Sequence, residues 1–231
     1  MLPPGPGLVQ LETADKAGLV QVSAAPWVPD GADIDELRQA AAECRGCELW
    51  KPATQVVFSA GNPRAAMALV GEQPGDVEDR QGIPFVGPAG KLLQRALADV
   101  GVSASDVYVT NAVKHFRFTE RGKRRIHATP QVTHIQACRP WLDAELRVVD
   151  PSLIVCLGAT AARSLLGASF RVSKQRGQVL ELPTPVGQRQ VLATVHPSSV
   201  LRTTGEDRDV AYAGLVDDLG VAAEAIRSTA R

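Results

Sequence analysis

Short apolar runs alternate with segments of helical spacing along this chain, and this alternation constrains the fold more than any other feature. The runs cover residues 66–71, 107–113, 153–157 and 190–195. Each fits a strand buried on both faces, because apolar residues dominate it. The helical segments between them can carry the chain back so that successive strands run parallel. The pattern predicts an α/β fold with a central, mostly parallel four-stranded sheet flanked by helices.

Helices are expected where apolar residues recur every three or four positions, at 33–44, 89–100, 132–149, 159–166 and 211–228. Gly177 and Gly187 frame a segment that we expect to form a small hairpin. Composition agrees with one folded domain over 31–231. Hydrophobic residues make up 45% of the chain and the formal net charge is zero, which excludes general disorder.

The first 30 residues differ from the rest of the chain. They contain five prolines, and no basic residue precedes Lys16. A secretory signal needs a basic start followed by an apolar stretch, so we expect a flexible Pro-rich tail over 1–30 instead. No apolar run approaches the roughly 20 residues that span a membrane. These features favour a cytoplasmic protein whose cysteines meet a reducing environment.

Three polar segments follow predicted strands, at 71–79, 111–127 and 196–202. The carboxyl ends of parallel strands lie at one edge of a sheet, where ligands bind in folds of this class. We therefore expect the three segments to converge on one site.

The first of these segments, 71–79 (GEQPGDVED), is acidic directly after a strand. Its carboxylates could stabilise a cation or position a nucleophile, although a solvated turn with surface acids fits the pattern as well. Residues 87–91 (GPAGK) are not a phosphate-binding loop. Leu92 follows where such a loop has Ser or Thr, and Phe85 stands where it has Gly.

The second segment is strongly basic within a chain that has no net charge. Residues 114–125 contain six Lys and Arg residues and one acid, Glu120, with Phe116 and Phe118 interleaved. Basic side chains neutralise phosphates and aromatic rings stack on bases, so the segment is typical of a local nucleic-acid contact. A solvated loop with inward-facing phenylalanines is the alternative.

The four cysteines are unevenly spaced. Cys44 and Cys47 form a C-x2-C pair, whereas Cys138 and Cys156 lie far along the chain. Four thiolates can hold a zinc ion or an iron–sulfur cluster, but the second C-x2-C pair of a zinc ribbon is missing. A redox pair plus two buried structural cysteines stays open, since free cysteine is often buried.

Together these segments resemble the iron–sulfur branch (family four) of the uracil-DNA glycosylase superfamily, and most closely UdgX, the branch that cross-links itself to uracil-containing DNA. The resemblance covers about 33–228 and leaves out the Pro-rich tail. GEQPG combined with KRRIH is its most specific part. The motifs that carry it are GEQPGDVED at 71–79, PFVGPAG at 84–90, VTNAVKHF at 109–116, KRRIH at 123–127 and HPSSVLR at 196–202.

The resemblance implies that a uracil nucleotide flips out of single- or double-stranded DNA into a pocket. Phe85 would stack on the uracil ring, and Asn111 would read its polar edge, because an amide donates and accepts hydrogen bonds at once. His196 would donate to a uracil carbonyl and stabilise the departing anion. A monomer in a bacterial cytoplasm is the usual form of such a protein.

The resemblance also implies that His127 attacks the sugar C1′ and stays attached, which limits the protein to one turnover. Glu72 would stabilise the cationic sugar and orient His127. Gln73 would support the basic loop and line the uracil site. The residues that would shape the DNA-binding loops and meet the DNA are Lys123, Arg124, Arg125, Ser198 and Arg202.

For the cysteines, the resemblance implies a [4Fe–4S] cluster with a structural role, bound by Cys44, Cys47, Cys138 and Cys156. Two other functions stay open. An ordinary family-four enzyme would release uracil, leave an abasic site and turn over many times. A non-catalytic module that binds damaged single strands would use the basic segment, but it leaves the pocket motifs unexplained.

Overall fold

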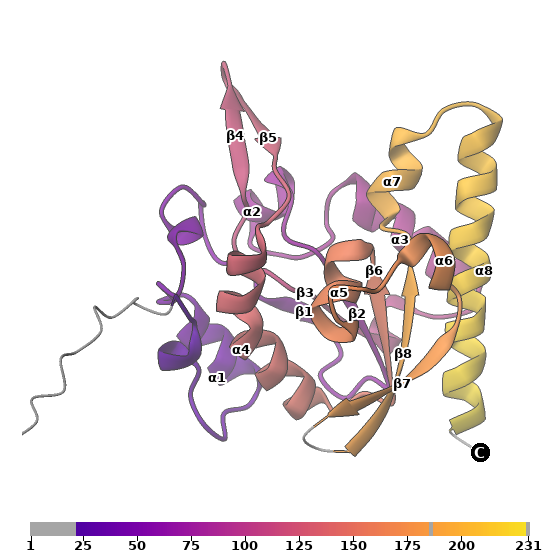
Figure 1. Ribbon diagram of the computed structural model, residues 1–231, viewed down its shortest axis with the longest axis horizontal. Helices are drawn as coiled ribbons and strands as arrows, with labels where there is room; N and C mark the ends of the chain where they lie inside the picture. Colours follow the sequence, from indigo (N-terminus) through magenta and orange to yellow (C-terminus); the bar gives the residue numbers. More distant parts are fainter. Residues whose placement is uncertain (1–21, 185–186, 230–231) are drawn as a thin grey trace, which may run out of the picture.

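The computed structural model describes residues 22–184 and 187–229 and is built around one large sheet (Figure 1). Its four inner strands correspond to the four apolar runs of the sequence, so the predicted parallel sheet is confirmed. In spatial order these mutually parallel strands are β3 (Val107–Asn111), β2 (Met67–Gly71), β6 (Leu153–Leu157) and β8 (Gly187–Thr194).

Two edge strands extend the predicted four-stranded sheet to six. β1 (Ser59–Gly61) pairs antiparallel with β3, and β7 (Val179–Thr184) pairs antiparallel with β8. The expected hairpin therefore exists, but it joins the sheet because its second strand is itself a central strand. β1 gave no sequence signal, since three residues (SAG) show neither strand length nor apolar alternation.

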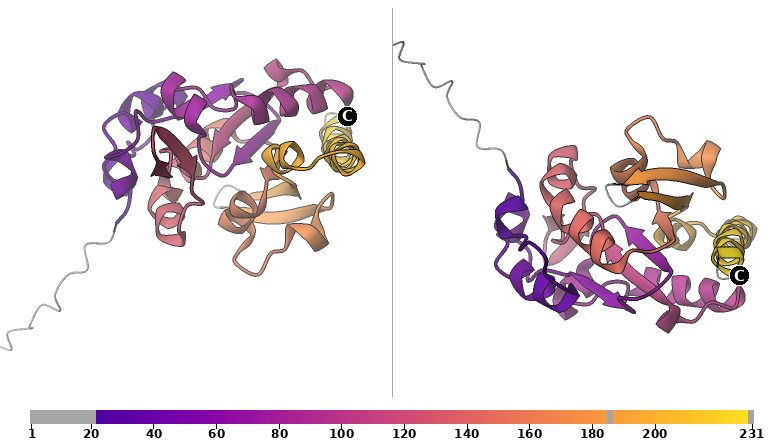
Figure 2. Two further views of the ribbon diagram at one scale, coloured as in Figure 1. Left: turned by 90° about the horizontal axis from the view of Figure 1, so that it is seen from above. Right: turned by 90° about the horizontal axis from the view of Figure 1, so that it is seen from below.

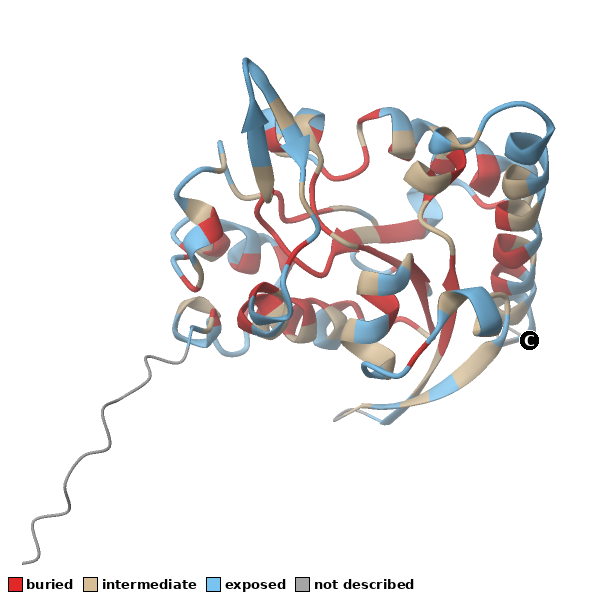
Figure 3. Cartoon of the chain, turned by 45° about the horizontal axis from the view of Figure 1, so that its top comes forward, coloured by how far each residue is buried: buried red, intermediate tan, exposed pale blue. Residues whose placement is uncertain are grey.

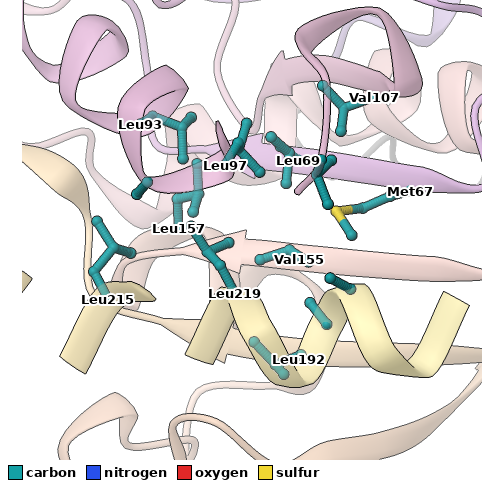
Figure 4. Close-up of a cluster of buried hydrophobic side chains, with 14 of the residues drawn as sticks. Met67, Leu69, Leu93, Leu97, Val107, Val155, Leu157, Leu192, Leu215 and Leu219 are labelled. Carbon is teal, nitrogen blue, oxygen red and sulfur yellow. The ribbon is translucent and has the colours of Figure 1, made fainter. Parts of the chain in front are cut away.

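One face of the sheet is covered by α3 (Pro88–Asp99) and α8 (Glu206–Thr229). Side chains from alternate strand positions pack against these helices in a core that includes Leu69, Leu97, Val155, Leu192 and Leu219 (Figure 4). All five are at most 2% exposed. Removing one such leucine side chain costs roughly 2–5 kcal/mol, so this core holds the strand ends firmly in place.

The opposite face is covered by α1 (Ile34–Ala41), α4 (Val132–Val149) and α5 (Ala159–Leu166), so helices lie on both sides of the sheet (Figure 2). The Asp33 carboxylate begins α1 by accepting hydrogen bonds from the backbone N–H groups of Asp35 and Glu36. Such a cap satisfies donors that the first helical turn cannot pair internally.

The folded domain starts earlier than the expected boundary at residue 31. Residues 1–21 of the expected tail lie outside the described residues, but 22–30 include a short 3₁₀ helix, η1 (Ala25–Trp27). Ala24 is buried, and its N–H donates to the carbonyl of Ala137 in α4 at 2.7 Å. Proline does not oppose this structure, because a helix needs no N–H donor in its first turn.

The basic segment forms a two-stranded hairpin rather than a loop. β4 (Phe118–Arg121) pairs antiparallel with β5 (Arg124–His127), and the pair projects from the body of the domain (Figure 1). Its tip is exposed, whereas the strands of the central sheet are buried (Figure 3). Gly122 makes the turn with φ +60°. Phe116, just before the hairpin, is buried and faces inward.

The remaining short elements lie between the main ones: η2 (Glu48–Trp50), α2 (Asp76–Gln81), η3 (Ala104–Asp106), α6 (Val172–Gln175) and α7 (Pro197–Arg202). In the part of the chain that the structure describes, no helix is both long and apolar enough to cross a membrane.

Candidate functional site

A cavity of about 530 Å³ opens where the carboxyl ends of the parallel strands meet. Glu72 follows β2, Asn111 ends β3, and His196 follows β8. Phe85 reaches the same cavity from the loop after α2, and His127 reaches it from the end of β5. The three polar segments therefore converge, as their positions after parallel strands predict.

The floor of the cavity is built around a glycine. A Cβ added to Gly71 would lie 2.3 Å from Asn111 Oδ1 and 2.6 Å from Phe85 Cζ, so only glycine lets both side chains rest against this strand end. Phe85 has φ +56°, a left-handed conformation that strains a residue with a side chain. Strain of this kind persists where the surrounding structure imposes it, and here it holds the ring over the strand end.

Asn111 is 2% exposed, and its Oδ1 has no hydrogen-bond partner among the described residues. A buried acceptor without a partner is rare in folded proteins. Because Asn111 also lines the cavity, its amide is placed to bind a polar ligand there.

His196 is held in one tautomer. Its Nδ1 accepts from the Ser198 backbone N–H at 3.1 Å and lies 2.8 Å from the Ser198 hydroxyl. Burial, with smaller contributions from the charges of His127 and Arg202, lowers the pKa of His196 to about 4. The ring is therefore neutral at ordinary pH. With Nδ1 used as an acceptor, the proton lies on Nε2 and can be donated in the cavity.

His127 and Glu72 face each other beside the cavity. His127 Nε2 lies 3.4 Å from Glu72 Oε1, and Glu72 Oε2 accepts a hydrogen bond from the Thr160 hydroxyl. Burial is the main cause that lowers the pKa of His127; the charge of Arg202 adds to the shift and that of Glu72 opposes it. A neutral imidazole keeps a lone pair and can act as a nucleophile. The adjacent carboxylate can offset positive charge.

Gln73 clamps the base of the hairpin. Its Nε2 donates to the carbonyls of Arg117 and Ala128, at 3.1 Å each, and its Oε1 accepts from the Arg117 N–H at 3.0 Å. These two residues flank β4 and β5, so one amide holds both strands. Both N–H donors of the amide are thereby used. Its expected support of the basic segment is what the structure shows. Gln73 also lines the cavity, and its contact with uracil stays a prediction.

Arg125 is committed to carboxylates of this chain. Its Nε donates to Asp76 Oδ1 at 2.5 Å, and its Nη1 donates to Asp79 Oδ2 at 2.7 Å. The Arg125 side chain is 14% exposed, and that of Asp79 is fully buried. This agrees with the expectation that Arg125 shapes the DNA-binding loop, because its guanidinium fixes the hairpin to α2; its contact with DNA stays a prediction.

The other residues expected to bind DNA lie on two sides of the cavity. Lys123 and Arg124 are exposed at the tip of the hairpin. Arg202, an exposed residue of α7, lines the cavity and donates to Ser198 Oγ at 3.0 Å. Ser198 also lines the cavity, and its hydroxyl contacts His196; its contact with DNA stays a prediction.

Three of the four cysteines lie in one cluster of packed hydrophobic side chains between α1 and α4. They are Cys44, Cys47 and Cys138. Cys44 Sγ accepts from Trp141 Nε1–H and Cys138 Sγ accepts from the Lys114 backbone N–H, both at 3.3 Å. Hydrogen bonds to sulfur are typical around metal-bound thiolates. Within the described ranges, no three His, Cys, Asp or Glu side chains come close enough to hold a single metal ion.

Cys156 does not join this group, which corrects the expected set of four ligands. It lies inside β6, in register with Val70 and Ala193, and packs in a separate apolar cluster. A cysteine in a strand buried on both faces behaves as a small apolar side chain. Cys156 was expected as a ligand because the resemblance to the iron–sulfur glycosylases implied all four cysteines.

His115 is a further side chain of a type that can ligate a metal, and it was not among the residues expected from the sequence. It directly follows Lys114, whose N–H donates to Cys138. Burial, and to a smaller extent the charge of Arg45 within the C-x2-C pair, lowers the pKa of His115 to about 4. His134, on α4, is already hydrogen-bonded at both ring nitrogens. His115 is therefore the better candidate to complete the cysteine group. Its position in the basic segment favoured a nucleic-acid contact instead, so no sequence pattern indicated it as a ligand.

Glu78 also supports the site without having been singled out. It is buried, its Oε1 accepts from the Gly87 N–H at 2.8 Å, and its Oε2 accepts from the Gly75 N–H at 3.1 Å. It thereby joins the acidic turn to the turn after Phe85. The available signal was an acid three residues after Gly75 at a helix start, which is the spacing of a capping box.

Comparison with known proteins agrees with this site. A family model for the uracil DNA glycosylase superfamily matches residues 58–220, which include all the cavity residues named above. The chain is 37% identical over 172 residues to a type-4 uracil-DNA glycosylase of Archaeoglobus fulgidus, an alignment that covers 73% of this chain and 83% of that protein. For a type-4 uracil-DNA glycosylase of Thermotoga maritima the identity is 36% over 166 residues, covering 71% and 81%.

A third relative, a type-4 uracil-DNA glycosylase of Sulfurisphaera tokodaii, is 32% identical over 173 residues, which cover 73% of this chain and 76% of the relative. These alignments extend over most of each protein rather than over one motif. The chain belongs to the uracil DNA glycosylase superfamily.

Proposed function

We propose that this protein excises uracil from DNA and then bonds to the exposed sugar through His127. Membership of the superfamily and the names of its relatives support the excision. The observation that carries the second step is the position of His127, whose Nε2 lies 3.4 Å from Glu72 Oε1 beside the cavity. A nucleophilic side chain is thus already in the site before any substrate binds.

Recognition of uracil rests on Phe85 and Asn111. The Phe85 ring supplies an aromatic face against which a flipped base can stack. Uracil presents an N–H between two carbonyls, which matches an amide that accepts at Oδ1 and donates at Nδ2. Cytosine presents an acceptor where uracil has this N–H. It would therefore leave Asn111 Oδ1 buried and unpaired, at a cost of about 1–3 kcal/mol.

Excision breaks the bond between uracil N1 and the sugar C1′, and the electron pair leaves with uracil as an anion. The Nε2–H of neutral His196 donates to a uracil carbonyl and stabilises this anion. The positive charge that develops on the sugar lies nearest to the Glu72 carboxylate, which offsets it. The two charges of the transition state thus meet opposite sides of the cavity.

Capture by His127 requires no proton transfer. In the tautomer with its proton on Nδ1, the Nε2 lone pair forms the new bond to C1′ and the ring takes over the positive charge, still beside Glu72. Uracil takes a proton from water after it leaves. A group held close to its target can reach an effective concentration on the order of 10⁵ M or more, which favours histidine over water.

A second function has its own support. The relatives are named type-4 uracil-DNA glycosylases, and those names describe excision of uracil. In that case water adds to the sugar, and the protein releases an abasic site and turns over. The two functions share every step up to the loss of uracil, so they differ only at His127.

A denaturing gel separates the two functions. Labelled uracil-containing DNA is incubated with the protein, boiled in detergent and divided into samples with and without alkali, while released uracil is quantified. We expect a slow covalent band and no more than one uracil per protein. His127→Ser should abolish the band but still release uracil, and the matched control Glu120→Ser, on the same hairpin, should keep the band.

Either of two results would reject capture by His127. A covalent band that persists in His127→Ser would place the bond on another residue. Many equivalents of uracil from the unmodified protein, with strand breakage only after alkali, would establish the ordinary enzyme. Intact DNA throughout would reject excision itself.

We also propose that this chain binds a [4Fe–4S] cluster through Cys44, Cys47, Cys138 and His115. The support is the group of three cysteines, of which Cys44 and Cys138 accept N–H hydrogen bonds at sulfur, and buried His115, which directly follows the residue that donates to Cys138. Thiolates and imidazoles both ligate iron–sulfur clusters. None of the four lines the cavity, so such a cluster would tie the segment after α1 to α4.

Iron and acid-labile sulfide per chain test this ligand set in anaerobically purified protein. Cys138→Ser and His115→Ala should lower the iron content, whereas Cys156→Ser should retain it. Loss of iron in Cys156→Ser would restore the four-cysteine set. A protein without iron and sulfide would reject the cluster.

A further inference from the structure

Thr160 contacts Glu72, the partner of His127, and does not line the cavity. It is the second residue of α5, which follows β6, and β6 runs parallel beside β2. The two strand ends therefore bring Thr160 next to Glu72, the residue that follows β2. The Thr160 hydroxyl donates its hydrogen bond to Glu72 Oε2.

The two oxygens of Glu72 consequently have different partners. Oε2 is held by Thr160, and Oε1 faces His127 Nε2 at 3.4 Å. The last torsion of a glutamate side chain has a broad, weak preference, so the carboxylate plane is not fixed by its own rotamer. A partner on one oxygen fixes the plane and directs the other oxygen.

The hydroxyl itself is firmly placed. Ala161 and Ala162, the next two residues of α5, are fully buried against the sheet. Gly158, just before α5, lies so close to His196 that an added Cβ would be 3.0 Å from His196 Cβ. Threonine is β-branched and has few side-chain rotamers. The start of α5 is thus packed between the sheet and His196, so the Thr160 hydroxyl has little freedom to move.

We propose that Thr160 is a positioning residue, which turns the Glu72 carboxylate so that Oε1 meets His127 and the charge that develops on the sugar. The inference rests on the proposed function and adds a residue that acts only through Glu72. Because Thr160 does not line the cavity, its loss should slow the reaction without weakening the binding of uracil-containing DNA.

The test compares Thr160→Val, which keeps the shape and removes the donor, with Thr160→Ser, which keeps the donor. Single-turnover rates of uracil release and of adduct formation are measured together with the affinity for uracil-containing DNA. Ser164→Ala, on the same helix, is the matched control, since its hydroxyl donates only to the Ala161 carbonyl. We expect Thr160→Val to be about tenfold slower, as for loss of a hydrogen bond to a charged group.

Thr160→Ser and Ser164→Ala should stay within about twofold of the unmodified rate, and affinity should change as little. In a Glu72→Gln background, Thr160→Val should have almost no further effect, because residues that act through one another are not additive. An unchanged rate in Thr160→Val would overturn the inference. So would equal losses in the Val and Ser variants, or a full additional loss on top of Glu72→Gln.

Failure of this inference can be told apart from failure of the proposed function. A protein that releases uracil without forming an adduct rejects capture by His127, yet the Thr160 variants still decide the inference through the rate of release. A protein that neither releases uracil nor forms an adduct overturns both.

Discussion

The two sides of the cavity are built in different ways. The side that would hold uracil consists of residues at the ends of core strands and in tightly packed turns, with Phe85 9% exposed and Asn111 2% exposed. The side that would attack the sugar is a projecting hairpin, on which the His127 side chain is 48% exposed. The proposed recognition residues are therefore part of the core, whereas the proposed nucleophile lies on a hairpin that projects beside it.

The hairpin is held mainly by polar contacts. Gln73 binds its two ends, and Arg125 ties β5 to Asp76 and Asp79 of α2. Individual hydrogen bonds contribute about 0.5–3 kcal/mol each, less than the burial of a large core side chain. The position of His127 should therefore be easier to lose than the shape of the uracil side, and mutations can separate the two.

The largest effect is expected on the uracil side, because both products depend on it: an adduct can form only after uracil has left the sugar. Gly71→Ala would place a methyl group 2.3 Å from Asn111 Oδ1 and 2.6 Å from Phe85 Cζ, which must both move. Uracil release and adduct formation should fall together, by on the order of 100-fold or more, since misplacement by about 1 Å has this effect. The measurement is the single-turnover rate of each product.

Gly220→Ala, whose added Cβ would have its nearest neighbour at 3.9 Å, is the matched control and should keep full activity. Loss of adduct alone in Gly71→Ala would contradict the assignment of Gly71 to the uracil side.

A smaller and more selective effect is expected for Arg125→Gln. This change removes the ion pairs that hold β5 to α2, so adduct formation should slow by on the order of tenfold while uracil release stays within about threefold. The ratio of adduct to released uracil in one time course is the measurement. Arg124→Gln changes the exposed neighbour and is the matched control.

A larger loss of DNA affinity in Arg125→Gln than in Arg124→Gln would mean that Arg125 contacts DNA directly. An equal loss of both products would mean that the two sides of the cavity are not independent.

The difference between the buried strand ends and the projecting hairpin also explains which parts of the site could be predicted from the sequence. The four inner strands and the helices between them are long, strongly apolar or periodic, so their patterns identified the sheet and the edge at which Glu72, Asn111 and His196 meet. The hairpin carries a charge pattern instead of an apolar one. Its strands therefore read as a loop, and the pairing of Arg125 with two aspartates about 50 positions earlier left no local signal.

The cysteines are a second case in which contacts between residues distant in sequence could not be predicted. The family resemblance implied Cys156 as a ligand, but only the register of β6 reveals that its side chain packs within the sheet core. Burial in a strand is visible in the sequence, whereas the distance to the other cysteines depends on tertiary structure. His115 and Thr160 were missed for the same reason, since each matters through a neighbour distant in sequence.

Gln73→Leu should have a weaker effect than Arg125→Gln. It removes three hydrogen bonds at the base of the hairpin but leaves the ion pairs to α2, so adduct formation should slow by about fivefold, with uracil release unchanged. Gln81→Leu, an exposed glutamine at the end of α2, is the control. Slower release of uracil in Gln73→Leu would show that this amide also touches the base.

The smallest effect is expected from pH alone, and it separates the two histidines. Capture needs neutral His127. The pKa of His127 is lowered from its ordinary value of 6.5, so adduct formation should stay constant down to pH 6.5 and should be lost only at a more acidic pH. Release needs neutral His196, whose pKa is lowered to about 4, so uracil release should continue between pH 6.5 and pH 4. The ratio of adduct to released uracil should therefore fall severalfold as the pH is lowered through this window, in single-turnover measurements at constant ionic strength. A ratio that rises, or two rates that fall with one midpoint, would mean that one shared group controls both steps. In that case the exposed hairpin and the buried strand ends would not work as separate parts.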